Sequence, residues 1–171
     1  NGELRGLRFS DVDRKNGVIH VQRTIKYVSG RGTIADSPKT RTSKRDIPLR
    51  GDILELLQEQ RKQTEIAGIR SIDAYYFEGY EQGEPISDTA ITQSLHRVVQ
   101  WIRQDGYDFP EITPHVLRHT FATRAIEAGM QPQTLKTILG HSSLAMTMDL
   151  YSHVMPSTKR EEMDKIANAF Y

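Results

Sequence analysis

The sequence has no cysteine, which excludes disulfide bonds, thiol nucleophiles and zinc sites built on thiolates. It has no apolar run approaching the roughly 18 residues of a membrane-spanning helix. It also has no charged segment followed by an apolar one that would resemble a signal peptide. Internal repeats and low-complexity segments are absent too. We therefore expect a soluble, cytoplasmic protein with no membrane partner.

The net charge is small, +1, but the charge is unevenly distributed along the chain. Residues 1–50 contain 12 lysines and arginines against 5 aspartates and glutamates, a net charge of +7. Residues 51–113 contain 5 against 12, a net charge of −7, and residues 114–171 carry +1. A basic first third can follow a phosphate backbone, while the acidic middle forms a solvated face turned away from it. Both segments can equally be ordinary solvated surface.

The length and the strand patterns predict one small α+β domain. A chain of 171 residues, 37% of them hydrophobic, can bury one core. Residues 17–25 alternate and are rich in β-branched side chains, which predicts a strand after an Asn-Gly turn. Two shorter strands are expected near residues 33–35 and 45–49, with Lys39 in their connecting turn. We expect a mostly helical domain with a small three-stranded antiparallel sheet on one edge.

Apolar residues at helical spacing predict the remaining elements. A helix capped by Asp52 should run to about Ala67, because Gly68 follows it. Another should begin at Ser87 or Asp88. Residues 75–77 are expected to form a strand or a buried turn. Further helices are expected from Pro114 to Gly129, over residues 133–139 and over residues 143–150, and Gly140 should end the helix over 133–139. The chain should close with an amphipathic tail.

Four residues near the end of the chain suggest phosphodiester chemistry. A tyrosine hydroxyl, here Tyr151, has a reference pKa of about 10, so it attacks phosphorus at neutral pH only where cationic donors hold the phosphate. The i, i+3 spacing of His115 and Arg118 places both on one helical face. The planar guanidinium of Arg118 can hold two phosphate oxygens without losing its charge. His141 can supply another donor.

Each of these residues also has an ordinary interpretation. A helical histidine is more often a core or surface residue than a catalyst, and a tyrosine at helical spacing is most often a core aromatic. A partly buried arginine needs an anionic partner, which can be structural. His119 is assigned to packing or a backbone hydrogen bond. His115 and His119 have the i, i+4 spacing of a metalloprotease histidine pair. A metal site is disfavoured, because Val116 occupies the position of the glutamate that follows the first histidine in those enzymes. Structural or surface roles are also assigned to His20, His96 and His153.

Five segments resemble the tyrosine recombinase family, the phage integrases and their transposon-encoded relatives. Residues 113–123 (TPHVLRHTFAT) resemble its His-x-x-Arg box, residues 139–143 (LGHSS) its second histidine box, and residues 148–154 (MDLYSHV) its nucleophile segment. Residues 37–49 (SPKTRTSKRDIPL) resemble the β-hairpin that carries the family's lysine, and residues 2–13 (GELRGLRFSDVD) the end of its first arginine box. The five motifs occur in the family's order across the whole chain, so the resemblance is specific.

The resemblance selects Lys39 as the family's lysine, with Lys44 as the alternative, and Glu3 as a supporting residue. The family's first catalytic arginine would lie immediately ahead of this sequence, and neither Arg5 nor Arg8 takes that role. We therefore expect a single catalytic-domain fragment of a longer integrase, without its upstream DNA-binding region and inactive by itself.

The activity implied by the resemblance is site-specific DNA recombination. Tyr151 would attack the scissile phosphate and form a 3′-phosphotyrosine link, while Lys39 protonates the leaving 5′-oxygen as general acid. Arg118 and the upstream arginine would hold the non-bridging oxygens, His141 would donate to one of them, and His115 would position or accept the tyrosyl proton. The ester conserves the bond energy, so no metal or nucleotide cofactor is implied.

The implied partner is duplex DNA, bound by a ring of four protomers, with a monomer or weak dimer in the absence of DNA. Residues 157–171 of the domain, which covers residues 1–171, would form a C-terminal docking helix. Three alternatives remain: a type I topoisomerase with the same covalent link, a noncatalytic DNA-binding module, and a helical interaction protein whose motif matches are accidental. The compact order of the motifs favours a recombinase over a topoisomerase.

Overall fold

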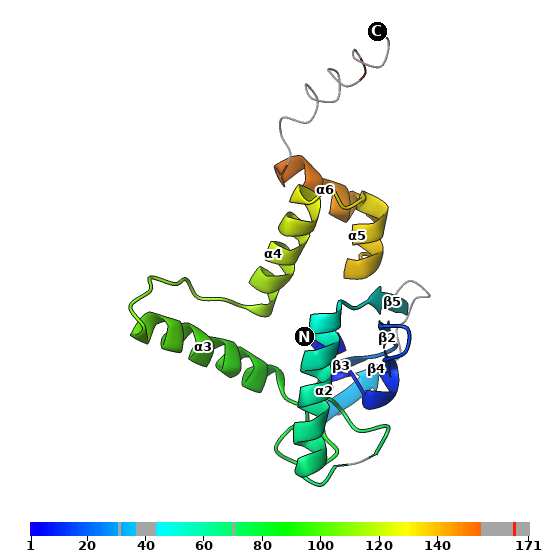
Figure 1. Ribbon diagram of the computed structural model, residues 1–171, viewed down its shortest axis with the longest axis vertical. Helices are drawn as coiled ribbons and strands as arrows, with labels where there is room; N and C mark the ends of the chain where they lie inside the picture. The colour runs from blue at the N-terminus through cyan, green and yellow to red at the C-terminus, as the bar shows by residue number, and fades with distance from the viewer. Residues whose placement is uncertain (31, 37–43, 70, 155–165, 167–171) are drawn as a thin grey trace. The chain divides into compact units, whose positions relative to one another are not determined.

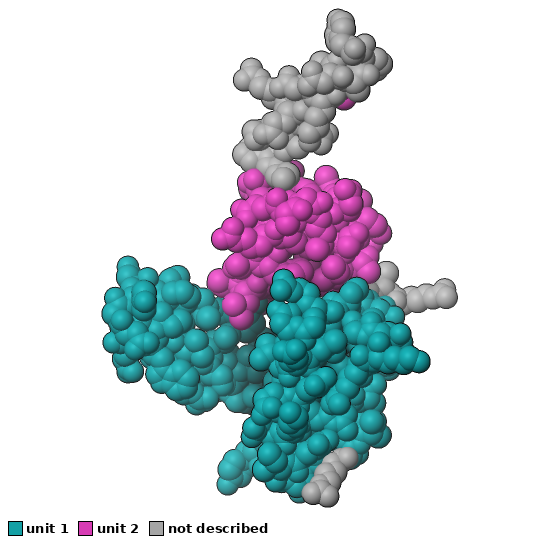
Figure 2. All heavy atoms as spheres, viewed as in Figure 1, with its two compact units in different colours: residues 1–114 teal, residues 115–171 magenta. Residues whose placement is uncertain are grey.

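The computed structural model describes residues 1–30, 32–36, 44–69, 71–154 and 166, which belong to two compact units (Figure 2). Unit 1 comprises Asn1–Pro114 and unit 2 His115–Tyr171. Lys39 and the predicted docking helix, apart from Ile166, lie outside the described residues. The organisation of the chain as one catalytic domain stays a prediction.

Unit 1 begins with two short helical turns and ends with two long helices (Figure 1). The turns are α1 (Gly2–Arg5) and the 3₁₀ helix η1 (Phe9–Asp11). The long helices are α2 (Gly51–Ile66) and α3 (Asp88–Gln104). Between η1 and α2 the chain forms the strands β1 (Val12–Asp13), β2 (Val18–Val21), β3 (Thr24–Val28), β4 (Gly32–Asp36) and β5 (Arg45–Pro48).

The strands form two antiparallel sheets, one of three strands in the order β1-β2-β5 and one of the two strands β3-β4. The prediction of one strand over residues 17–25 is wrong, because the extended pairing is interrupted between β2 and β3. There, the Arg23 side chain donates to the Gly6 carbonyl at 3.0 Å and pairs with the buried Asp11. Pro48 lacks an N–H donor and stands on the edge strand β5, where a ladder tolerates it.

The core of unit 1 is aromatic and joins segments far apart in the sequence. Phe9 and Tyr76 meet edge to face with ring centroids 4.7 Å apart, a favourable geometry for aromatic pairs. Tyr76 is fully buried and Tyr75 is also buried, so the expected burial of residues 75–77 is confirmed for these two residues. Half-buried side chains also pack here, among them Leu57 of α2 and Ile19 of β2.

The helix boundaries of unit 1 follow local capping. The hydroxyl of Ser87 accepts the Ala90 N–H at 3.0 Å and caps α3, as predicted. Asp52 does not cap α2: the helix starts one residue earlier, and the Asp52 carboxylate accepts the N–H of Ile53 within the first turn. Gly68 follows the end of α2 with φ +95°, a conformation that glycine adopts without strain.

Unit 2 contains the helices α4 (Pro114–Glu127, Pro114 itself belonging to unit 1), α5 (Pro132–Leu139) and α6 (Leu144–Val154). Proline at its first position suits α5, and Gly140 ends it in the left-handed conformation with φ 70°. The last helix continues past Leu150, where the sequence predicted its end, so Tyr151 lies within it. The buried cluster holding the unit together consists of Ala122, Ala125, Ile126, Leu135 and Leu139.

Within the described parts of the chain, no helix combines the length and the apolar character needed to cross a membrane.

Candidate active site

Four of the predicted site residues lie in unit 2. His115 and Arg118 come from the first turns of α4, His141 from the residues that join α5 to α6, and Tyr151 from the third turn of α6. Helix packing rather than loop conformation therefore sets three of the four positions. Glu3 belongs to unit 1.

Arg118 binds the end of α5. Its Nη2 donates to the Leu139 carbonyl oxygen at 2.6 Å. The last carbonyls of a helix lack partners within the helix, so a guanidinium is a suitable donor there. Because Gly140 turns the chain directly afterwards, the same contact brings the Arg118 charge close to His141. Burial, and secondarily the charge of Arg118, lower the pKa of the His141 imidazole below its usual value.

His141 also contacts α6. Its Nδ1 lies 2.9 Å from the hydroxyl oxygen of Thr147, which is completely buried. The imidazole thus has a cation from α4 and a hydroxyl from α6 as neighbours. With one ring nitrogen engaged, the other is the nitrogen that can meet a ligand.

Tyr151 is both a core residue and a hydroxyl with a defined partner. Its half-buried ring packs against the buried cluster of unit 2, and its hydroxyl donates to the Met130 carbonyl oxygen. Burial raises the pKa of Tyr151 above its usual value. The phenol is therefore neutral and hydrogen-bonded in this state, and a nucleophilic role requires it to leave the carbonyl and lose its proton.

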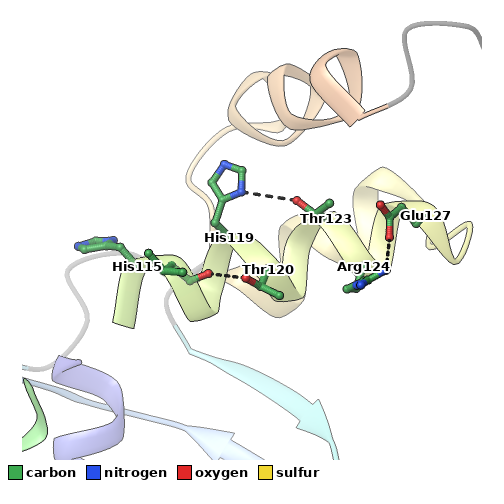
Figure 3. A pocket seen from close by; sticks show the side chains of 7 residues that line it. His115, His119, Thr120, Thr123, Arg124 and Glu127 are labelled. Atoms are coloured by element: carbon green, nitrogen blue, oxygen red, sulfur yellow. Dashed lines mark hydrogen bonds and ion pairs between the residues drawn. The ribbon is translucent and has the colours of Figure 1, made fainter. Parts of the chain in front are cut away.

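His115 stands apart from these contacts. It is exposed, and within the part of the chain that the structure describes no hydrogen bond joins it to Arg118, His141 or Tyr151. It lines a pocket of about 570 Å³ along α4 (Figure 3). The other lining residues are Val116, His119, Thr120, Thr123, Arg124 and Glu127.

His119 differs from its predicted role. It is exposed, and its Nδ1 lies 3.5 Å from the hydroxyl of Thr123 one turn later on α4, as Figure 3 shows. The prediction of packing or a backbone hydrogen bond is therefore wrong for this residue. No group of three or more potential metal ligands occurs among the described residues.

Glu3 makes a two-point contact in unit 1. Both of its carboxylate oxygens accept hydrogen bonds from the Arg45 guanidinium, at 2.6 and 2.8 Å. Arg45 opens β5, and its side chain is only 5% exposed. Helix α1, which carries Glu3, also lies directly against β3: a Cβ atom added at Gly2 would come within 2.7 Å of the Ile25 carbonyl oxygen. The short helix is thus fixed by packing and by charge.

Arg5 and Arg8, which were not predicted to be catalytic, have structural partners. Arg5 is buried; its Nε donates to the Ile86 carbonyl at 2.6 Å, and it pairs with Asp88 at 3.2 Å. Arg8 places its guanidinium over the ring of Tyr75, 4.9 Å from the centroid, and donates to that phenol oxygen. These contacts give both arginines a role within unit 1.

Three participants were not predicted from the sequence: Thr147, Arg45 and the Met130 carbonyl. Thr147 lies one helical turn before Tyr151, and this spacing was the signal that could have identified it. Arg45 was visible only as one of several basic residues near the predicted hairpin. A backbone carbonyl carries no sequence signal at all.

Comparison with known proteins identifies the class of this arrangement. Residues 1–158 match the phage integrase family, so the chain belongs to that family, as the motifs suggested. A XerC-like tyrosine recombinase of Caldanaerobacter subterraneus subsp. tengcongensis is 29% identical over an alignment of length 181. The match covers 99% of this chain and 46% of that protein. The transposase from transposon Tn916 of Enterococcus faecalis is 26% identical, covering 96% and 41%.

A solved structure is also similar over nearly the whole chain. The Tn1549 transposon integrase, in complex with transposon right end DNA, matches with a TM-score of 0.83 and 31% identity, covering 97% of this chain and 54% of that one. The expected fold class, mostly helical with small antiparallel sheets, is thereby confirmed. The chain spans about half the length of the relatives it matches.

Proposed function

We propose that this chain is the catalytic part of a tyrosine recombinase that cuts and rejoins duplex DNA at specific sites. The observation that carries the proposal is the arrangement in unit 2, in which Arg118 of α4 lies beside His141, while Tyr151 of α6 packs against the buried cluster of the same unit. Membership of the phage integrase family supports it. Relatives named as a tyrosine recombinase, a transposase and a DNA-bound integrase point to the same substrate class.

In the proposed reaction the Tyr151 oxygen attacks the scissile phosphorus and the bond from phosphorus to the 5′-oxygen breaks. The products are a 3′-phosphotyrosyl link and a 5′-hydroxyl. His115 takes the tyrosyl proton, and Lys39 gives a proton to the leaving oxygen. Arg118 holds the non-bridging oxygens and His141 donates to one of them, which stabilises the charge that builds up in the transition state.

The link conserves the ester energy, so the hydroxyl of a second strand can reverse the attack and complete an exchange. We propose a ring of four protomers on two duplexes, with residues 157–171 docking between neighbours, and a monomer or weak dimer without DNA. The basic residues 1–50 are the segment we expect to follow the DNA backbone. The protein would act in the cytoplasm.

Strand exchange separates this proposal from a topoisomerase or a simple DNA-binding module. The full-length protein is incubated with two differently labelled duplexes that carry the junction sequences of the mobile DNA element encoding it. In parallel, it is incubated with a supercoiled plasmid that lacks these sequences. A recombinase yields products that join the two labels and leaves the plasmid supercoiled. Relaxation without exchange would indicate a topoisomerase, and a mobility shift with neither product would indicate a binding module.

A further inference from the structure

Thr147 bonds to a side chain outside its own helix rather than to the backbone of that helix. Four other helical threonines of the chain donate to the carbonyl four residues earlier: Thr64, Thr92, Thr120 and Thr137, at 2.9 to 3.0 Å. Thr147 instead meets a side chain, the Nδ1 of His141, at 2.9 Å. It is also completely buried, and a buried hydroxyl is retained in native structures where it has a hydrogen-bond partner.

We propose that Thr147 is a positioning residue that fixes the orientation and the tautomer of His141, so that Nε2 carries the proton offered to the phosphate. The inference rests on the proposed function and deepens it. A neutral imidazole has one donor and one acceptor nitrogen. When the Thr147 hydroxyl donates to Nδ1, the proton must reside on Nε2, which then serves as the donor.

The surroundings of His141 favour the neutral ring that this arrangement needs. Burial and the neighbouring Arg118 guanidinium both disfavour the imidazolium, and they lower the pKa of His141. Since a protonated ring would have no acceptor for the Thr147 hydroxyl, the two features are consistent. The cation that disfavours a second charge comes from α4, and the hydroxyl comes from α6.

The placement of Thr147 also couples the phosphate donor to the nucleophile. Thr147 and Tyr151 are four residues apart on α6, so they lie on the same face of one helix. Packing of α6 on the rest of unit 2 therefore positions the nucleophile Tyr151 and fixes the tautomer of the donor His141 together. When α6 is displaced, the tautomer of His141 is no longer fixed.

The test uses three variants of the full-length protein. Thr147→Val keeps the shape and removes the hydroxyl, Thr147→Ser keeps the hydroxyl, and Thr137→Val is a control at a threonine that bonds only along its own helix. We expect the rate of covalent complex formation to fall by about 10- to 100-fold in Thr147→Val. This reduction is smaller than the one caused by removing an oxyanion donor altogether. It should stay within about threefold in Thr147→Ser and in the control.

Nitrogen-15 spectra of the imidazole, with the resonance assigned by a His141→Gln variant, measure the tautomer directly. Wild type and Thr147→Ser should show the proton on Nε2, and Thr147→Val a mixture. A wild-type ring protonated on Nδ1, or an unchanged tautomer in Thr147→Val, would overturn the proposal, even if that variant is less stable. If wild-type protein forms no tyrosine-linked DNA at all, the proposed function fails instead, and the tautomer measurement still decides the role of Thr147.

Discussion

Arg118 has a fixed protein partner before any substrate binds. One nitrogen of its guanidinium already donates to the Leu139 carbonyl, which orients the planar group. A lysine at this position would supply a point charge without the fork that meets two oxygens. The chemistry proposed for unit 2 therefore depends on the shape of the group as well as on its charge.

We predict that Arg118→Lys in the full-length protein lowers the cleavage rate by about 100- to 1000-fold, the usual cost of losing a preorganised donor to a transition-state oxyanion. Arg124→Lys is the matched control, because Arg124 lies on the same helix in an exposed pair with Glu127. Cleavage is measured as protein-linked DNA on a suicide substrate. Near-normal cleavage by Arg118→Lys would make that arginine a structural residue.

Two histidines, His141 of unit 2 and His20 of unit 1, have pKa values shifted in opposite directions. His141 has a lowered pKa, so its neutral form stabilises the fold above the usual pKa of 6.5, and that contribution is lost as pH falls through its lower folded value. The hydrogen bond that His20 donates to the Asp46 carboxylate raises the pKa of His20, whose contribution is present below 6.5 and is lost as pH rises through its higher value. NMR titration should place His141 below and His20 above 6.5.

Asp46→Asn is the check on this assignment. It should bring the pKa of His20 back towards its usual value and leave that of His141 unchanged, because burial and the charge of Arg118 cause the shift of His141. A His20 pKa that does not respond would show that its shift has another origin.

The sequence predicted the chemical types at the site better than their contacts. The spacing of His115 and Arg118, and the histidine after Leu-Gly, are local patterns that a single helix or turn expresses. The hydrogen bond from Tyr151 to Met130 spans 21 residues, and it depends on how α6 packs. Thr147 escaped notice because a helical threonine ordinarily bonds to its own backbone.

At the scale of elements, the N-terminal cap of α3 and the C-terminal end of α5 were predictable, and strand pairing was not. Ser87 and Gly140 act on the chain next to them, so their effect follows from sequence alone. The break between β2 and β3 depends on Arg23, whose partners Gly6 and Asp11 lie elsewhere in unit 1. A pattern of alternating residues contains no information about such a partner.

The pairing of α1 with β5 gives an element-scale prediction. Glu3→Gln removes the carboxylate charge from the contact with the buried Arg45 side chain and should lower the free energy of unfolding by about 1–2 kcal/mol, less than for a fully buried pair because Glu3 is 41% exposed. Glu59→Gln removes an exposed pair with Lys62 and should leave the stability nearly unchanged.

Urea unfolding, monitored through the far-UV signal, measures both variants. Equal stability of Glu3→Gln and Glu59→Gln would mean that the contact between Glu3 and Arg45 contributes nothing to the anchoring of α1.

At the scale of the whole molecule, the uneven charge of the chain has a measurable consequence. Residues 1–50 carry a net charge of +7, while the chain as a whole carries +1. Binding through a basic segment releases counterions, so affinity for DNA should fall steeply with salt although the protein is nearly neutral.

We predict weak, salt-sensitive binding of duplex DNA by the 171-residue chain. Fluorescence anisotropy from about 50 to 200 mM salt measures the slope. Binding that does not respond to salt would contradict this prediction. A variant with Arg14 and Lys15 replaced by glutamine should show a smaller slope than one with Arg61 and Lys62 replaced, because only the first pair lies in the basic segment.

The central claim is that Tyr151 becomes covalently attached to DNA, and mapping the attached residue tests it most directly. Full-length protein is trapped on a nicked suicide duplex and digested, and the DNA-linked peptide is identified by mass spectrometry. We predict a 3′-phosphotyrosyl adduct at Tyr151, lost in Tyr151→Phe and retained in Tyr80→Phe, where the tyrosine is fully exposed. An adduct on any other residue, or trapping of Tyr151→Phe at the wild-type level, would contradict the account.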